Sequence, residues 1–585
     1  MSRHARPADA PRPTLRFTQA STLAALAAVA LAAGCGSTPE FDVIVRHGTV
    51  VDGTGAPARP ADVGIVGDRI TEVGDLSSRR GRVEVDASNL VVAPGFIDTQ
   101  GQSGRALLLD GAAESHLRQG ITSEIIGEAS SPAFWQADTG DVALLNNRGI
   151  PFDWGGLAGF LQKLETAGIA LNLGSLVPAN QVRSNVMRLA ARAPTDAERQ
   201  AMRLAVEQAM RDGAFGLSSA LIYPPGSFMT TGDLVELARI AAAHGGIYVS
   251  HIRGETHRLL TALDEAVTIG REAGLPVVVY HLKVAERSRW GTMPDVLAKI
   301  EEARASGVDI SATQYPYTVA GTSLDACLPD WVLEGGTGAA LRRLADPDVR
   351  RRIRREVERG HDGWENFLRS AGFDGVTIAS VPSGADDSVV GQNLAAIASA
   401  RGADPWDVFF DLLVEHQLAV SALYALMHDD DVRAAMTRPW ITIGTDSAAQ
   451  TDAAGQPGKP HPRGFGTMPR VLGHYVREHG ILSLPEAVHK MTSAAARQMR
   501  LVDRGELRPG AFADVVVFDP ATIGDRATFD EPRQYPAGIR TVIVNGVIAL
   551  DAGEPTGRRA GRGLRRAPVV PRPSPVAAVA AAPAS

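Results

Sequence analysis

Cysteine is scarce in this chain of 585 residues, which carries two of them, at Cys35 and Cys327. A framework of disulfides therefore cannot be the basis of its stability. The chain also lacks a strong excess of charge of either sign. Its formal net charge of −7 is small for this length and favours neither nucleic acid nor another polyanion as a partner. With 44% hydrophobic and 21% charged residues, the composition is typical of a globular protein with a large core.

The chain has one long apolar run, at its N-terminus, and it is too short to span a membrane comfortably as a mature helix. Four arginines precede the apolar residues 21–34, and Cys35 follows them. The pattern resembles a bacterial lipoprotein signal over residues 1–35, with cleavage before Cys35 and lipid on its sulfur. Ala32 departs from that pattern, because a larger aliphatic residue is usual there; the alternative is an ordinary cleaved signal peptide. Both alternatives predict export, and the first predicts a periplasmic lipoprotein whose membrane contact is the anchor at Cys35.

The middle of the chain alternates short β-branched runs with amphipathic segments, which predicts an α/β fold. Eight runs qualify as strands: 91–98, 122–128, 170–177, 215–221, 246–252, 276–282, 308–317 and 440–446. Eight strand–helix units predict a (β/α)8 TIM barrel over residues 91–500, with its chemistry at the C-terminal ends of the strands. The stretch from about 325 to 430 interrupts the alternation and is predicted to be a largely helical insertion.

Both ends of the mature chain contain a different pattern of short strands and tight turns. Short runs of alternating valine and isoleucine, separated by turns that contain glycine, recur in residues 40–90. Similar short runs recur in residues 501–556, with a hairpin turn at Asn545-Gly546. The two sets are predicted to pair into one small β-sandwich domain. Residues 557–585 are rich in arginine, proline and alanine without periodicity, and are predicted to form a disordered tail.

Two predicted strands, the fifth and the sixth, each end in a histidine. His281 follows His251 after one helical pattern, at the length of a βαβ unit, so both imidazoles should lie at the same edge of the barrel. Two imidazoles at one edge form half of a metal site. The alternative is two unrelated histidines with structural hydrogen bonds.

Carboxylates end two further strands. Glu128 ends the second strand and Asp446 ends the eighth, in the sequence ITIGTDS. Together with the two histidines they can hold zinc and leave one acid/base group beside it. We predict Glu128, His251 and His281 as metal ligands and Asp446 as the catalytic acid/base. A salt bridge is the alternative for Glu128, and a structural carboxylate is the alternative for Asp446.

From about residue 41 to residue 565, the chain resembles the amidohydrolase superfamily and, within it, the N-acyl-D-amino-acid deacylases, or D-aminoacylases. Matching segments occur in order along the chain. They are APGFIDT, RQGITSEIIGE, GGIYVSHIRGE, YHLKV, YPYT, IGTDS, HPRGFGTMPRVLGHYVRE, LSLPEAVHKMTS, RGELRPGAFADVVVFDP and VNG. The resemblance implies a barrel with a flanking β-sandwich and zinc-dependent hydrolysis of an amide.

The chain departs from that family at the metal site. Gln100 and Gln102 stand where the superfamily has a His-x-His pair, and a glutamine amide is a poor zinc ligand. Gly127-Glu128-Ala129-Ser130 stands where the deacylases have a zinc-binding cysteine, and the fourth strand offers no lysine to bridge two metals. We therefore predict about one zinc per chain. Gln100 and Gln102 are expected to line the pocket and to hydrogen-bond substrate or water.

The resemblance also implies a site for the substrate carboxylate. Arg463 matches the family arginine in this role, and a guanidinium binds a carboxylate through two parallel hydrogen bonds. Lys283 and Tyr315 are the other predicted substrate contacts. The family serine that follows this tyrosine is Gly321 here, so Thr322 or Ser323 would have to take its place.

These residues predict a metal-dependent amidohydrolase that cleaves N-acyl-D-amino acids or related small amides with an activated water. One alternative is a cyclic amidase or a dipeptidase on the same scaffold. The other is a non-catalytic substrate-binding lipoprotein that has lost its metal.

Overall fold

A computed structural model describes residues 39–360, 364–382, 384–451 and 458–567 of the chain. The predicted signal, with Cys35, and the last part of the predicted tail lie outside the described residues. No helix in the described ranges combines the length and apolar character that a membrane span requires.

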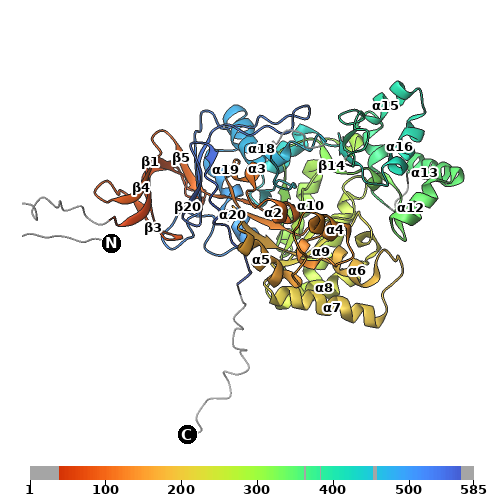
Figure 1. The fold of residues 1–585 in the computed structure, drawn as a ribbon, viewed down its shortest axis with the longest axis horizontal. Coiled ribbons are helices and arrows are strands. Elements are labelled where there is room, and N and C mark those ends of the chain that lie inside the picture. The colour runs from red at the N-terminus through yellow and green to blue at the C-terminus, as the bar shows by residue number, and fades with distance from the viewer. Residues whose placement is uncertain (1–38, 361–363, 383, 452–457, 568–585) are drawn as a thin grey trace, which may run out of the picture.

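A closed barrel of parallel strands forms the centre of the described chain (Figure 1). In order around the barrel its strands are β6 (Phe96–Asp98), β7 (Ile121–Ile126), β8 (Asn172–Ser175) continued by β9 (Val177–Pro178), β10 (Gly216–Ala220), β11 (Ile247–His251), β12 (Val277–Val279), β13 (Ile310–Gln314) and β17 (Ile441–Ile443). A parallel bridge between Gly101 and Ser447 joins the first strand to the last. The predicted (β/α)8 barrel is confirmed.

Helices cover the outside of the barrel. They are α2 (Gly104–Leu109), α3 (Glu114–Leu117), α4 (Gly140–Asn147), α5 (Gly156–Ala167), α6 (Ala179–Met187), α7 (Asp196–Arg211), α8 (Thr231–Ala243), α9 (Leu259–Ala273), α10 (Met293–Ala305), α17 (Asp429–Met436), α18 (Arg463–Arg470), α19 (Leu484–Met491) and α20 (Ser493–Gln498), with a π-helical turn after α18 (Val471–Glu478). The apolar residues of α9 recur every three to four positions and are buried against the strands. Gly274 ends this helix in the left-handed conformation, with φ +70°, which glycine adopts without strain.

Strands from both ends of the chain share one sheet, which lies beside the barrel. The N-terminal strands are β1 (Phe41–Val50), β2 (Arg59–Val66), β3 (Arg69–Gly74), β4 (Gly81–Asp86) and β5 (Val91–Pro94); the C-terminal ones are β18 (Val515–Phe518), β19 (Ile539–Val544), β20 (Val547–Asp551) and β21 (Glu554–Pro555). The two sets meet where β18 pairs antiparallel with β5. Side chains alternate across β18, so Val515 and Val517 enter the core of this sheet while Val516 and Phe518 pack against the barrel helices.

The predicted first barrel strand, 91–98, is in fact two strands. Residues before the Pro94-Gly95 step belong to the shared sheet as β5, and residues after it begin the barrel as β6. Both pieces are buried, and apart from Asp98 they are apolar, so their hydrophobicity gave no sign of the change of sheet. Proline lacks an amide donor and commonly ends a strand.

The insertion between β13 and β17 is largely helical, as predicted, but it also contains short strands that the sequence did not indicate. It contains α11 (Asp330–Leu333), α12 (Thr337–Leu344), α13 (Pro347–Arg359), α14 (Phe367–Ala371), α15 (Leu394–Arg401) and α16 (Pro405–Glu415). It also holds an antiparallel sheet in the order β14 (Ala320–Ser323), β16 (Ser421–Tyr424), β15 (Val376–Ser380). These strands are short, and their partners are distant in sequence, which conceals them from local patterns. The helices of the insertion project at the end of the molecule opposite β1 (Figure 1).

The prediction of a disordered tail from residue 557 is wrong for its first part. Residues up to Ala567 run along the barrel and make backbone hydrogen bonds with it. Gly561 N–H donates to Ile169 O at 2.8 Å, Leu173 N–H donates to Arg562 O at 2.9 Å, and Leu564 N–H donates to Leu173 O at 2.7 Å. Arg566 N–H also donates to the carbonyl of Gly213 at 2.9 Å. Arginine-rich composition suggested disorder, but backbone pairing does not depend on composition.

We expect deletion of residues 558–567 to destabilise the barrel. Four backbone hydrogen bonds that contribute about 0.5–1.5 kcal/mol each predict a loss of roughly 2–6 kcal/mol in the free energy of unfolding. Guanidinium unfolding of a chain that ends at Gly557 measures this loss, with a chain that ends at Ala567 as the control. Equal unfolding midpoints for the two chains would contradict the structural role of this segment.

Candidate functional site

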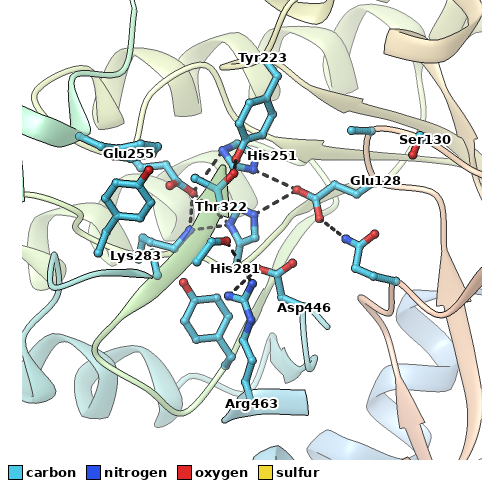
Figure 2. A pocket seen from close by; sticks show the side chains of 17 residues that line it. Glu128, Ser130, Tyr223, His251, Glu255, His281, Lys283, Thr322, Asp446 and Arg463 are labelled. Carbon is cyan, nitrogen blue, oxygen red and sulfur yellow. Dashed lines mark hydrogen bonds and ion pairs between the residues drawn. The ribbon is translucent and has the colours of Figure 1, made fainter. Parts of the chain in front are cut away.

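The predicted site residues do meet at the C-terminal edge of the barrel (Figure 2). Glu128 follows β7 after Gly127, whose φ of +100° and tight approach to Leu176 O suit only glycine. His251 is the last residue of β11. His281 and Asp446 follow their strands in the left-handed region, with φ of +36° and +49°. Such strain in non-glycine residues is typical of functional sites, where the surrounding structure enforces it.

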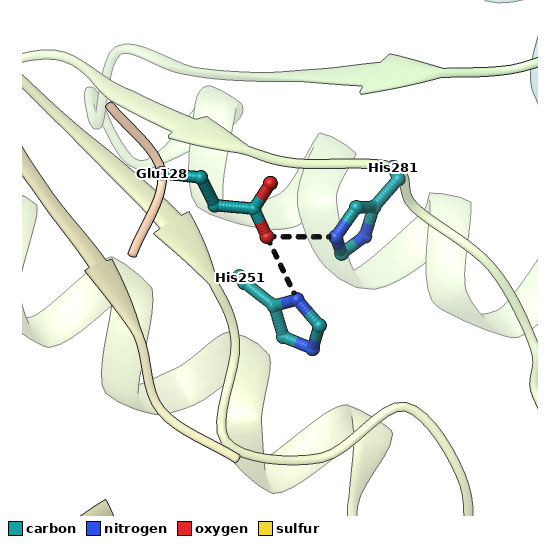
Figure 3. A group of neighbouring side chains, drawn as sticks. All are labelled: Glu128, His251 and His281. Atoms are coloured by element: carbon teal, nitrogen blue, oxygen red, sulfur yellow. Dashed lines mark hydrogen bonds and ion pairs between the residues drawn. The ribbon is translucent and has the colours of Figure 1, made fainter. Parts of the chain in front are cut away.

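Three of these side chains form a compact cluster (Figure 3). Glu128 Oε1 lies 3.0 Å from His251 Nδ1 and 3.3 Å from His281 Nε2. The ligand atoms lie within 4.8 Å of one another, and each residue is buried. Two imidazole nitrogens and one carboxylate oxygen are a donor set that suits zinc, and three protein ligands leave a coordination position open. The cluster therefore fits a metal ion chemically and geometrically.

The surroundings of this cluster favour the ionised carboxylate of Glu128 and the protonated ring of His281. Burial opposes ionisation of Glu128, but hydrogen bonds to His251 and His281 outweigh it and hold the pKa of Glu128 well below its usual range. For His281, burial and the Lys283 ammonium lower the pKa, and Glu255 and Glu128 together raise it to about 9. A cation between these residues would replace the proton that the cluster otherwise attracts.

Glu255, which the sequence analysis missed, supports this cluster from behind. Its Oε1 lies 3.0 Å from His281 Nδ1 and 2.5 Å from Lys283 Nζ. Burial opposes its ionisation, but the Lys283 ammonium holds the pKa of Glu255 well below its usual range. Metal-binding histidines commonly direct their second ring nitrogen to a carboxylate, which fixes the tautomer and the ring. The signal was present in the segment HIRGE, where Glu255 follows His251 by four positions.

Lys283 lines the cavity as predicted, but its ammonium is not free to bind substrate alone. It is paired with Glu255, and both side chains are 5% exposed. The prediction that Gln100 lines the pocket and contacts substrate is wrong. Gln100 is 1% exposed, its Nε2 donates to Glu128 Oε2, and its Oε1 accepts from Thr313 Oγ1, so it is not placed to contact substrate. Gln102 does line the cavity, and its Nε2 also donates to Glu128 Oε2.

Asp446 and Arg463 form an ion pair beside the cluster, with 2.9 Å between Asp446 Oδ2 and Arg463 Nη1. Burial raises the pKa of Asp446 despite the opposing charge of Arg463, which makes the carboxylate a stronger base. The Arg463 guanidinium lies 4.8 Å from the centre of the Tyr315 ring. Burial raises the pKa of Tyr315 well above its usual range, so its hydroxyl remains a neutral hydrogen-bond donor.

A cavity of about 270 Å³ joins these groups. Thr322 lines it and Ser323 does not, so of the two residues offered in place of the family serine, Thr322 is the one that faces the site. Tyr223 was also missed by the sequence analysis. It lines the cavity, and its hydroxyl lies 2.8 Å from Thr322 Oγ1. The loop that carries Tyr223 follows β10 and has no motif, so only the fold places it here.

Comparison with known proteins agrees with this geometry. A model of the amidohydrolase family matches residues 83–550. The chain is 35% identical over 528 residues to a D-aminoacylase from Alcaligenes xylosoxydans xylosoxydans, covering 90% of this chain and 98% of that protein. It is 35% identical over 532 residues to an N-acyl-D-glutamate deacylase from the same source, covering 90% of this chain and 97% of that protein.

A solved structure is also similar. The crystal structure of an N-acyl-D-glutamate deacylase from Bordetella bronchiseptica, complexed with zinc and a phosphonate mimic of the tetrahedral intermediate, superimposes with a TM-score of 0.75. Its sequence identity is 32%, and the match covers 90% of this chain and 99% of that one. The chain therefore belongs to the amidohydrolase family.

Proposed function

We propose that this protein is a zinc-dependent hydrolase that cleaves the amide of N-acyl-D-amino acids. The observation that carries the proposal is the convergence of Glu128, His251 and His281 at one point, beside the Asp446–Arg463 pair and on the wall of one cavity. The similarity to D-aminoacylase and N-acyl-D-glutamate deacylase, over nearly the whole length of those proteins, supports the choice of substrate.

Glu128 Oε1, His251 Nδ1 and His281 Nε2 would hold one zinc ion. When bound, zinc supplies a Lewis acid for the amide carbonyl and makes water acidic enough to lose a proton near neutral pH. Glu255 and Lys283 together keep the His281 ring in place, because Glu255 Oε1 lies 3.0 Å and Lys283 Nζ lies 2.7 Å from its Nδ1 atom.

Asp446 acts as the acid/base of the reaction. Its carboxylate accepts the proton of the attacking water and then donates it to the leaving nitrogen, so the products are a carboxylic acid and a free amine. The raised pKa of Asp446 suits this exchange, since a stronger base accepts the proton more readily. The peptide N–H of Asp446 donates to Gln100 O at 2.8 Å, which holds the residue against the first strand.

Arg463 binds the α-carboxylate of the substrate, with Tyr315 and Thr322 as hydrogen-bond donors on the same wall. Lys283 attracts the substrate carboxylate through its positive charge while its ammonium stays paired with Glu255. We also propose that the protein is exported and is held at the membrane from the periplasm by lipid on Cys35. The N-terminal sequence pattern supports that location.

A panel of substrates tests the activity. We expect N-acetyl-D-amino acids to be hydrolysed at least about 100-fold faster, in kcat/KM, than their L-enantiomers, because the carboxylate and the amide must both reach fixed groups. Removal of metal with a chelator should abolish the reaction, and added zinc should restore it. Faster cleavage of hydantoins or dipeptides would instead indicate a cyclic amidase or a dipeptidase. Absence of both turnover and bound metal would indicate a binding protein.

A further inference from the structure

The amides of Gln100 and Gln102 converge on a single oxygen of Glu128. Gln100 Nε2 donates to Glu128 Oε2 at 3.1 Å, and Gln102 Nε2 donates to the same atom at 2.9 Å. Glu128 is 7% exposed, so few water molecules compete with these two donors. The other oxygen of this carboxylate, Oε1, faces His251 and His281. The two oxygens of Glu128 therefore have separate partners.

Gln100 also connects Glu128 to His281 through a third residue. The hydroxyl of Thr313, on β13, donates to Gln100 Oε1 at 2.8 Å and accepts the peptide N–H of His281 at 2.7 Å. Thr313 is fully buried. A closed ring of contacts thus runs from Glu128 through Gln100 and Thr313 to His281, and back across the 3.3 Å between His281 Nε2 and Glu128 Oε1.

The loop that carries both glutamines is itself held rigidly. Asp98 Oδ1 accepts the peptide N–H of Gln100 at 3.0 Å, and Glu124 Oε1 accepts that of Ser103 at 2.8 Å. Asp98 and Glu124 are both fully buried. Gly101 lies so close to Glu124 that a Cβ atom there would collide with its side chain. The two amide groups therefore have little freedom to turn away from Glu128.

This geometry has a consequence for metal binding. An oxygen that accepts two N–H donors in a buried site is poorly placed to bind a cation as well, because the donors occupy its lone pairs and present the positive ends of their dipoles. Glu128 is left to bind through Oε1 alone. The space beside Oε2 is lined by amide hydrogens, which repel a second cation.

We propose that Gln100 and Gln102 form a glutamine clamp, a pair of positioning residues that makes Glu128 a ligand through one oxygen and restricts the site to one zinc. The inference rests on the proposed function in that zinc binds to Glu128, His251 and His281. It assigns the glutamines to the metal ligand rather than to the substrate, where the sequence alone had placed them.

The test measures zinc affinity, which does not depend on turnover. Gln102→Met keeps the length of the side chain and removes its donor, and Gln102→Ala removes the side chain at the cavity wall, where water can fill the space. We expect the wild-type protein to bind one zinc per chain, and each variant to bind that zinc about 10–100-fold more weakly in competition with a chelator. The absorption bands of the Co2+-substituted variants should also shift, since Glu128 can then bind through both oxygens.

Gln498 offers the matched control. It is a part-buried glutamine at the opposite end of the barrel, where it accepts from Thr442 Oγ1 at 2.6 Å and donates to Ser311 Oγ and Ala312 O, each at 3.0 Å. Gln498→Met should leave zinc affinity and the Co2+ spectrum unchanged, even if it lowers the melting temperature.

Two results would overturn the clamp while leaving the proposed function intact. One is a wild-type protein that binds one zinc with an affinity that neither Gln102 variant changes. The other is a wild-type protein that binds two zinc ions tightly and loses one when Gln102 is replaced, which would make the glutamine a ligand. A wild-type protein that binds no zinc would refute the proposed metal chemistry itself.

Discussion

Replacement of His281 by alanine is expected to remove most of the bound zinc and nearly all amide hydrolysis. The substitution leaves Glu128 and His251 as the remaining ligands, and two protein ligands hold zinc poorly. It also removes the ring that Glu255 and Glu128 contact from opposite sides. We expect a decrease in kcat/KM of about three orders of magnitude or more, because both the polarised carbonyl and the activated water depend on the ion.

Metal analysis of purified His281→Ala, together with hydrolysis of an N-acetyl-D-amino acid, measures both effects. His244→Ala is the control, since His244 pairs with Glu207 at the end of α8 and does not line the cavity. This control should keep its full zinc content and rate. A His281→Ala protein with full metal and full rate would show that His281 is not a ligand, and the proposed site would fail.

Replacement of Asp446 by asparagine is expected to lower the rate without loss of metal. Asparagine keeps the size of the side chain but cannot accept a proton, so the attacking water and the leaving nitrogen lose their acid/base. We expect kcat to fall by about 10²–10⁴-fold. Zinc content should remain near that of the wild type, because the three predicted ligands do not include Asp446.

Asp525→Asn is a close control for this substitution. Asp525 pairs with Arg470 at 3.1 Å, much as Asp446 pairs with Arg463 at 2.9 Å, and each aspartate side chain is 14% exposed. Asp525 does not line the cavity, so its replacement should change stability but not kcat. If Asp446→Asn lost its zinc along with its rate, Asp446 would be a ligand, and another group would have to serve as the base.

Much of this site could be derived from the sequence. Parallel strands place their C-terminal ends at one edge of a barrel, so Glu128, His251, His281 and Asp446 had to lie near one another once the eight strands were recognised. Their types then predicted a metal cluster beside an acid/base group. This inference needed no distances, because the regular alternation of strands and helices already places the strand ends side by side.

Other features could not be derived in this way. The pairing of Glu255 with His281 and Lys283, and the contact of Tyr223 with Thr322, depend on the path of loops that follow the strands. Local patterns do not encode those paths. The same reason explains the missed antiparallel sheet in the insertion and the ordered C-terminal segment, whose partners are far away in the chain.

For Gln100 and Gln102, the sequence and the tertiary structure each determined a different property. The sequence by itself determined that imidazole is absent from these positions, and therefore that they are poor ligands for a second zinc. It also determined the barrel, through apolar strands at regular intervals.

Only the tertiary structure decided what the amides of Gln100 and Gln102 do instead. Their direction depends on Thr313 of the seventh strand, which holds Gln100, and on the buried carboxylates of Asp98 and Glu124, which hold the loop. These contacts bring both donors to Glu128 Oε2 rather than to the substrate. Hydrogen-bond direction is a property of packed side chains, and it becomes defined only when distant segments meet.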